Sequence, residues 1–144
     1  MDQIFTLAEL PKVAKKLARL VKPGDVVALS GELAAGKTTL TSALLKALGY
    51  DGQVASPTFV IERRYPLVRS SKIKEVVHLD FYRLTPEQIG QLDWSETIGS
   101  TGTLTLIEWP ERVTGQLPPQ TKNIKLEIID DQTRRLTFSE NPLN

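Results

Sequence analysis

The sequence predicts an α/β fold built on a parallel sheet. Three short apolar runs, at residues 25–30, 75–80 and 103–108, have the length and the continuous apolar character of strands buried on both faces. The first run leads into a glycine-rich stretch at residues 31–38, and a helical pattern follows over residues 38–48. A buried strand, a glycine-rich turn and a helix, in this order, form the setting in which such a turn binds phosphate.

The chain begins with a predicted helix. Thr6 and Glu9 have the spacing of a capping box, in which each side chain satisfies a backbone N–H of the first turn. Apolar residues then recur at helical intervals until residues 22–24 end the pattern. Pro11 disturbs this pattern, because a proline inside a helix removes a backbone hydrogen bond, and we expect it to delay the start of the helix.

The other elements are predicted with less regular patterns. Residues 53–74 fit either a long loop or an extended hairpin, and both interpretations stay open. Thr85 and Pro86 are typical of the cap and first turn of a short helix. Alternating polar and apolar residues at 124–128 and 135–138 predict a half-exposed hairpin at the edge of the sheet.

The composition limits the class of protein. Eighteen basic and seventeen acidic residues leave a net charge of +1, so contact with RNA requires a local patch or a partner. The absence of cysteine excludes disulfides and thiolate metal sites. No leader pattern is visible, and no apolar stretch approaches the ~18 residues that span a bilayer. We therefore expect one domain over residues 1–144, cytoplasmic and without a membrane segment.

The glycine-rich stretch is a complete G-x-x-x-x-G-K-T phosphate-binding loop. Its glycines let successive N–H groups point at phosphate oxygens, and the following helix adds its positive dipole end. We expect Lys37 to reach the β- and γ-phosphates of a nucleotide and the Thr38 hydroxyl to ligate Mg²⁺. A chance glycine turn is the disfavoured alternative. The predicted nucleotide-binding residues are Gly31, Glu32, Leu33, Ala34, Ala35, Gly36, Lys37, Thr38 and Thr39.

Two of the predicted strands end in an acid, Asp80 and Glu108. Ligands of parallel α/β sheets lie beyond the carboxyl ends of the strands, so both acids are candidates for a site with hard oxygen ligands. We interpret Asp80 as holding a metal-bound water, and Glu108 as either a direct Mg²⁺ ligand or the group that orients the attacking water. The alternative for each is a solvated strand end. His78, inside an apolar run, is interpreted as a core residue.

Several other residues have two interpretations. Thr58 lies where switch segments of such proteins lie, so it contacts the γ-phosphate or Mg²⁺, or else belongs to a plain turn. Trp109 packs under the nucleotide site or against a partner. The first predicted helix has a basic face, which we interpret as exposed to solvent; the alternative is a surface that binds tRNA or an acidic partner. This face consists of Lys12, Lys15, Lys16, Arg19 and Lys22. Residues 63–74 are also basic, and for them a contact with a partner or RNA stays open. Arg134 and Arg135 are interpreted mainly as edge-strand charges, although one of them could reach a nucleotide.

The loop, together with SPTF at residues 56–59, HLDFYRL at 78–84 and IEWP at 107–110, resembles one specific family. This is the bacterial ATPase subunit of tRNA threonylcarbamoyladenosine biosynthesis, the TsaE-like (formerly YjeE-like) family. The resemblance covers almost the whole chain, and its D-x-Y-R-L and E-W-P signatures are far more specific than the loop. It implies a three-layer P-loop NTPase fold, with a mixed, mainly parallel central sheet flanked by helices.

The resemblance also implies an activity and partners. Members of the family bind ATP and Mg²⁺, hydrolyse ATP slowly alone, and work with a transferase subunit and its paralogue on the adenosine beside the tRNA anticodon. We therefore expect Lys37, Asp80 and Glu108 as catalytic residues, and Thr38, Asp80 and Glu108 at the metal. Glu32 and Ala34 depart from the usual Asp and Gly, and Ala34 costs about 1 kcal/mol only if its position needs a positive φ.

Two other functions stay open, a small-molecule P-loop kinase and a non-hydrolysing, nucleotide-dependent adaptor. The candidate lid of a kinase, residues 62–74, is short and lacks an evident acceptor base. In the adaptor, nucleotide occupancy alone would drive assembly. No Asn-Lys-x-Asp motif for guanine is present, and no arginine finger is fixed by the sequence, so we expect a partner to complete the site.

Overall fold

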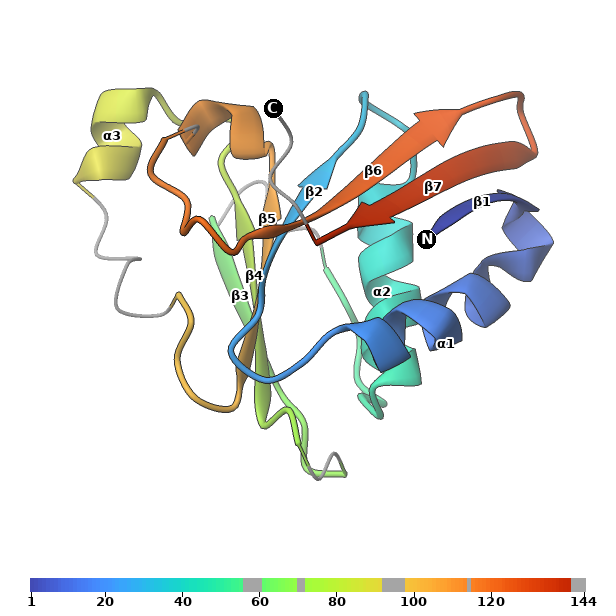
Figure 1. The fold of residues 1–144 in the computed structure, drawn as a ribbon, viewed down its shortest axis with the longest axis horizontal. Coiled ribbons are helices and arrows are strands. Elements are labelled where there is room, and N and C mark those ends of the chain that lie inside the picture. The colour runs from blue at the N-terminus through green and yellow to red at the C-terminus, as the bar shows by residue number, and fades with distance from the viewer. Residues whose placement is uncertain (56–60, 70–71, 92–97, 114, 141–144) are drawn as a thin grey trace.

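The computed structural model describes residues 1–55, 61–69, 72–91, 98–113 and 115–140. Within them, seven strands form one mixed sheet in the order β1-β7-β6-β2-β5-β4-β3 (Figure 1). Neighbouring strands run parallel from β6 through β2 and β5 to β4, and the outer pairs are antiparallel. The strands are β1 (Asp2–Thr6), β2 (Val26–Ser30), β3 (Glu62–Pro66), β4 (Glu75–Asp80), β5 (Thr103–Glu108), β6 (Lys122–Ile128) and β7 (Thr133–Ser139).

Helices cover both faces of the sheet and give the fold three layers. They are α1 (Leu10–Leu20), α2 (Lys37–Ala47) and α3 (Pro86–Gly90), with 3₁₀ turns η1 (Leu7–Glu9) and η2 (Pro110–Val113). Because successive strand residues point to opposite faces, Val27 of β2 joins the core beneath α1 and α2, whereas Val26 joins a second core with Ile89 of α3 and Val113 of η2 (Figure 1). The mixed, three-layer arrangement implied by the family resemblance is confirmed.

The N-terminus corrects two of the predictions. Residues before the first helix form strand β1, which pairs antiparallel with β7, so the hairpin of β6 and β7 lies inside the sheet and not at its edge. The capping interaction does form, because the Thr6 amide donates to the Glu9 carboxylate at 2.9 Å, but it precedes the turn η1. The α-helix begins only at Leu10, with Pro11 in its first turn, where a missing N–H costs least.

The remaining elements lie close to their predicted positions. Of the two interpretations of residues 53–74, the hairpin is the correct one for residues 62–66, which form β3 and pair antiparallel with β4. Thr85 caps α3, accepting a hydrogen bond from the Gln88 amide at 3.3 Å. Among the described residues, no helix is long and apolar enough to cross a bilayer.

Candidate nucleotide-binding site

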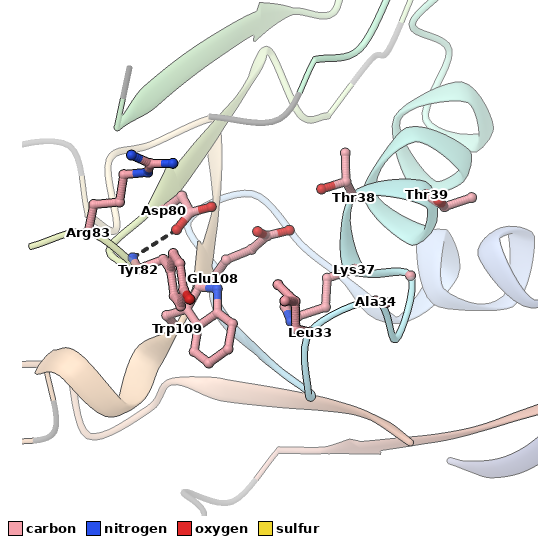
Figure 2. A pocket seen from close by; sticks show the side chains of 11 residues that line it. Leu33, Ala34, Lys37, Thr38, Thr39, Asp80, Tyr82, Arg83, Glu108 and Trp109 are labelled. Atoms are coloured by element: carbon pink, nitrogen blue, oxygen red, sulfur yellow. Dashed lines mark hydrogen bonds between the residues drawn. The ribbon is translucent and has the colours of Figure 1, made fainter. Parts of the chain in front are cut away.

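A cleft of about 500 Å³ opens at the carboxyl ends of β2, β4 and β5. Figure 2 shows the loop before α2 on one side of it and the ends of β4 and β5 on the other. Asp80 and Glu108 are direct neighbours in the parallel register of β4 and β5, which brings both predicted acids to the loop. The lining residues are Leu33, Ala34, Gly36, Lys37, Thr38, Thr39, Asp80, Tyr82, Arg83, Glu108 and Trp109.

The loop backbone restricts the residue type at three positions, one by a close approach to a neighbouring strand and two by a positive φ. A Cβ at Gly31 would lie 2.6 Å from the carbonyl oxygen of Leu126, so only glycine fits there. Gly36, directly before α2, has a φ of 104°. Ala34 also has a positive φ, 65°, and its Cβ therefore costs about 1–2 kcal/mol in a conformation that glycine adopts freely. The departure from the family pattern at this position thus has an energetic cost.

Lys37 is buried at the start of α2, and its ammonium is held by the loop itself. Its Nζ donates to the carbonyl oxygens of Gly31 at 2.6 Å and Glu32 at 3.1 Å. It also lies 4.5 Å from the centroid of the Trp109 ring, a cation–π contact. Burial lowers the pKa of Lys37, and the carboxylates around it, Glu108 first among them, offset this only in part. The ammonium is therefore poorly hydrated, which favours its binding to an anion.

The two acids are both buried but differently supported. One oxygen of Asp80 accepts a hydrogen bond from the Tyr82 amide at 2.9 Å, which fixes the carboxylate at the end of β4 (Figure 2). The side chain of Glu108 is 4% exposed, and its Oε1 lies 3.4 Å from Nε2 of His78. Burial raises the pKa of Glu108, but the contacts with His78 and Asp80 outweigh it, so the pKa lies below its usual value. Glu108 is thus a carboxylate at neutral pH.

Trp109 forms part of the cleft wall, and its two interpretations, packing at the nucleotide site and contact with a partner, both stay open. Its φ is 59°, a conformation that is rare and strained for a bulky residue. Its ring packs against Tyr82 with centroids 4.7 Å apart, and Lys37 lies over the same ring. Thr58, the predicted switch residue, lies outside the described residues.

A second cleft, of about 230 Å³, lies on the other side of the loop and was not predicted. Thr39 connects the two, because its side chain points away from the acids whereas that of Thr38 faces them (Figure 2). Arg134 is not an edge charge but a buried residue, and its Nε donates to the Ala35 carbonyl at 2.9 Å. The second cleft is lined by Phe5, Leu7, Leu10, Ala34, Ala35, Gly36, Thr39, Leu126 and Arg134.

The sequence did not predict Tyr82 and Arg83 as lining residues. The main interpretation of Arg134 as an edge-strand charge is wrong, whereas the alternative, that it reaches a nucleotide, stays a prediction. The burial of Arg134 was predictable from the alternation of β7, because alternate residues of a strand point to the same face. Arg134 lies two residues before Leu136 and four before Phe138, which both point into the core. The signal for Tyr82 and Arg83 was their position directly after the acid that ends β4.

The donors in the first cleft suit a hard cation that is bound together with phosphate. Among the described residues, no group of three or more acidic or histidine side chains is arranged to hold a metal by itself. The hydroxyl of Thr38 and the carboxylates of Asp80 and Glu108 nevertheless line one cleft. Mg²⁺ typically takes only one or two carboxylates and completes its shell with water and phosphate oxygens, so this oxygen set fits it.

Parallel central strands, a phosphate loop between β2 and α2, and acids at the ends of β4 and β5 define a P-loop protein of the NTPase fold class. The family model described as "Threonylcarbamoyl adenosine biosynthesis protein TsaE" matches residues 5–136. The chain belongs to the TsaE family.

Individual relatives agree with this assignment. The chain is 36% identical over 132 residues to the tRNA threonylcarbamoyladenosine biosynthesis protein TsaE of Streptomyces coelicolor, covering 89% of this chain and 88% of that protein. It is 35% identical over 131 residues to the protein of the same name from Bacillus subtilis, covering 91% and 79%. The crystal structure of YdiB from Bacillus subtilis has a TM-score of 0.75 at 29% identity, covering 99% of this chain and 86% of that one.

Proposed function

We propose that this protein is a Mg²⁺-dependent ATPase that acts in tRNA threonylcarbamoyladenosine biosynthesis. The observation that carries the ATPase proposal is the cleft that joins Lys37 and Thr38 of the loop to the carboxylates of Asp80 and Glu108. The pathway is supported by membership of the TsaE family and by the names of relatives that match most of the chain.

Phosphate binding would use contacts that the loop already makes to itself. The Lys37 ammonium exchanges the carbonyl oxygens of Gly31 and Glu32 for phosphate oxygens, which carry more negative charge and give stronger hydrogen bonds. The N–H groups at the start of α2 and the positive end of its dipole point at the same ligand.

The acids would serve the metal and the attacking water. Thr38 and Glu108 would hold Mg²⁺, and Asp80 would bind one of its water molecules. The ion would supply positive charge that neutralises the nucleotide phosphates. Asp80 is kept in place by the Tyr82 amide. In hydrolysis, water attacks the γ-phosphorus, the bond to the bridging oxygen breaks, and ADP and phosphate leave. Lys37 and the loop amides stabilise the developing charge.

The second cleft would hold the base of the nucleotide. It shares Ala34, Gly36 and Thr39 with the phosphate cleft, so a ligand can continue from one into the other around the loop. The apolar side chains of Leu7 and Leu10 suit the faces of a purine ring.

The kinase alternative is disfavoured by the sheet. Residues 62–66, the start of the candidate lid, are strand β3 and pair with β4, so they cannot close over a substrate. The adaptor alternative differs from the ATPase only in whether ATP is consumed.

The proposed partners remain a transferase subunit and its paralogue. A contact with tRNA, through them or through exposed residues of α1 such as Lys12 and Lys15, stays a prediction.

The test is phosphate release, measured for the purified chain alone and with both partner subunits and tRNA. We expect slow release alone and faster release in the complex. If ATP survives many rounds of tRNA modification, the ATPase proposal is wrong and the adaptor is favoured. ATP-dependent phosphorylation of a metabolite would instead favour the kinase.

A further inference from the structure

His78 is a buried polar residue that packing alone does not explain. Its side chain is 0% exposed, in the middle of β4. Among the described residues, neither of its ring nitrogens makes a hydrogen bond, and neither does Oε1 of Glu108. A buried polar group without a partner costs free energy, so an apolar residue of similar size would stabilise the fold more at this position.

The register of the sheet places His78 directly behind the proposed metal site. In the pairing of β4 with β5, Asp80 lies opposite Glu108, and His78 lies opposite Leu106. His78 is two residues before Asp80, so its side chain is on the same face of the sheet as both acids and further from the cleft. From there Nε2 of His78 faces Oε1 of Glu108 at 3.4 Å. This carboxylate oxygen has no hydrogen-bond partner among the described residues, and Nε2 of His78 is the polar atom that faces it.

We propose that His78 is a positioning residue that holds the Glu108 carboxylate in the orientation in which it binds Mg²⁺. The Nε2–H group donates to Oε1, which leaves the rest of the carboxylate for the cleft. Such contacts are often long in the free protein and shorten when the ligand is bound, which agrees with a separation of 3.4 Å. Groups that orient a metal ligand typically change metal affinity by about 10–100-fold when they are removed. The inference rests on the proposed function, because it requires that Glu108 binds the metal.

The alternative is that His78 only fills space. The two roles differ in what they require of a substitute. Packing requires volume, whereas positioning requires an N–H donor directed at Glu108. His78→Met keeps the approximate size and removes the donor, and His78→Gln keeps a donor on a side chain of similar size.

The experiment measures binding of a non-hydrolysable ATP analogue by calorimetry, first in EDTA and then over a series of Mg²⁺ concentrations. In His78→Met, the Mg²⁺ concentration that gives half of the maximal effect on binding should be about tenfold higher than in wild type. The affinity for the analogue in EDTA should change by less than about twofold. His78→Gln should recover most of the wild-type Mg²⁺ dependence. Urea unfolding of each variant checks that the fold is retained, and His78→Leu replaces His78→Met should the latter fail to fold.

The outcomes separate the inference from the proposed function. If wild-type protein shows no Mg²⁺-dependent binding of the analogue, the proposed function itself is wrong. If the wild type shows it and His78→Met shows it equally, the positioning role is wrong and Glu108 orients itself. The positioning role would also be wrong if His78→Met and His78→Gln lost the same affinity for the analogue, in EDTA as well as in Mg²⁺. A packing defect lowers the affinity even without the metal.

Discussion

The ammonium of Lys37 lies 4.5 Å from the centre of the Trp109 ring, and Trp109 has a positive φ of 59°. The two facts are linked, because the unusual backbone directly after β5 turns the indole toward the loop, between Lys37 and Tyr82. The strain at Trp109 is therefore located where the ring meets the proposed phosphate-binding lysine. Backbone strain of this kind is concentrated at functional sites.

Replacing Lys37 by alanine should abolish tight ATP binding. The variant removes the only ammonium among the residues that line the described cleft, and with it the charge-assisted hydrogen bonds to phosphate that the proposed function requires. We expect the affinity to fall by at least about 100-fold, or about 2.7 kcal/mol. Calorimetry with ATP and Mg²⁺ measures it. Lys46→Ala, on the exposed surface near the end of α2, is the matched control and should bind like wild type.

Glu108→Ala should separate binding from turnover. The loop and Lys37 are untouched, so we expect nucleotide affinity to fall less than about tenfold, whereas the rate of phosphate release should fall by about 100-fold or more. Single-turnover hydrolysis in the partner complex measures the rate. A near-normal rate would remove Glu108 from the mechanism. Glu87→Ala, in the first turn of α3 and outside the cleft, controls for the loss of an acid.

The same residue should give stability a defined pH dependence. Because the pKa of Glu108 in the folded protein lies below its ordinary value of 4.5, the ionised form stabilises the fold above that pH. This contribution is lost as the pH falls through the lower, folded-state pKa. In urea unfolding at a series of pH values, the free energy of unfolding of wild type should therefore lose its excess over that of Glu108→Gln below pH 4.5. A difference that is constant with pH would contradict the assigned shift.

Leu7→Ser should weaken the binding of ATP but not of its phosphates alone. Leu7 lines the second cleft and is 39% exposed, so a smaller polar side chain would remove the proposed apolar contact with the base at little cost to folding. We expect about a fivefold to tenfold loss for ATP, equivalent to about 1 kcal/mol of apolar contact, and none for inorganic tripolyphosphate. Ile4→Ser, at an exposed position outside the cleft, should change neither. Equal weakening of both ligands would show that the second cleft does not hold the base.

The parts of the fold that the sequence predicted are those whose patterns are local. The strands β4 and β5 have continuous apolar runs, and their predicted bounds are the observed ones. Strand β1 was missed because Phe5 alone among its residues is buried, and because its partner β7 lies at the other end of the chain. Pairing of that kind depends on tertiary contacts that no local pattern encodes.

The same distinction applies to the site. The loop motif predicted Lys37 and Thr38, and the two acids were predicted because the strand ends of a parallel sheet meet at one edge. All four residues line one cleft, and their roles stay predictions. The contact of His78 with Glu108 could not be predicted, because it depends on the register between β4 and β5. A shift of that register by one residue would turn the His78 side chain relative to Glu108 and break the contact.

Ala34→Gly should stabilise the protein, although glycine normally destabilises. Ala34 has a φ of 65°, where a Cβ is strained by about 1–2 kcal/mol, and this exceeds the extra backbone entropy that glycine loses on folding. We expect the free energy of unfolding to rise by about 0.5–1 kcal/mol, measured by urea unfolding without nucleotide. Ala47→Gly, at the end of α2 in ordinary helical conformation, is the control and should lower it by about 0.5–1 kcal/mol. Opposite signs for the two substitutions follow only if strain at residue 34 is real, whereas destabilisation by both would show that the loop tolerates the alanine without cost.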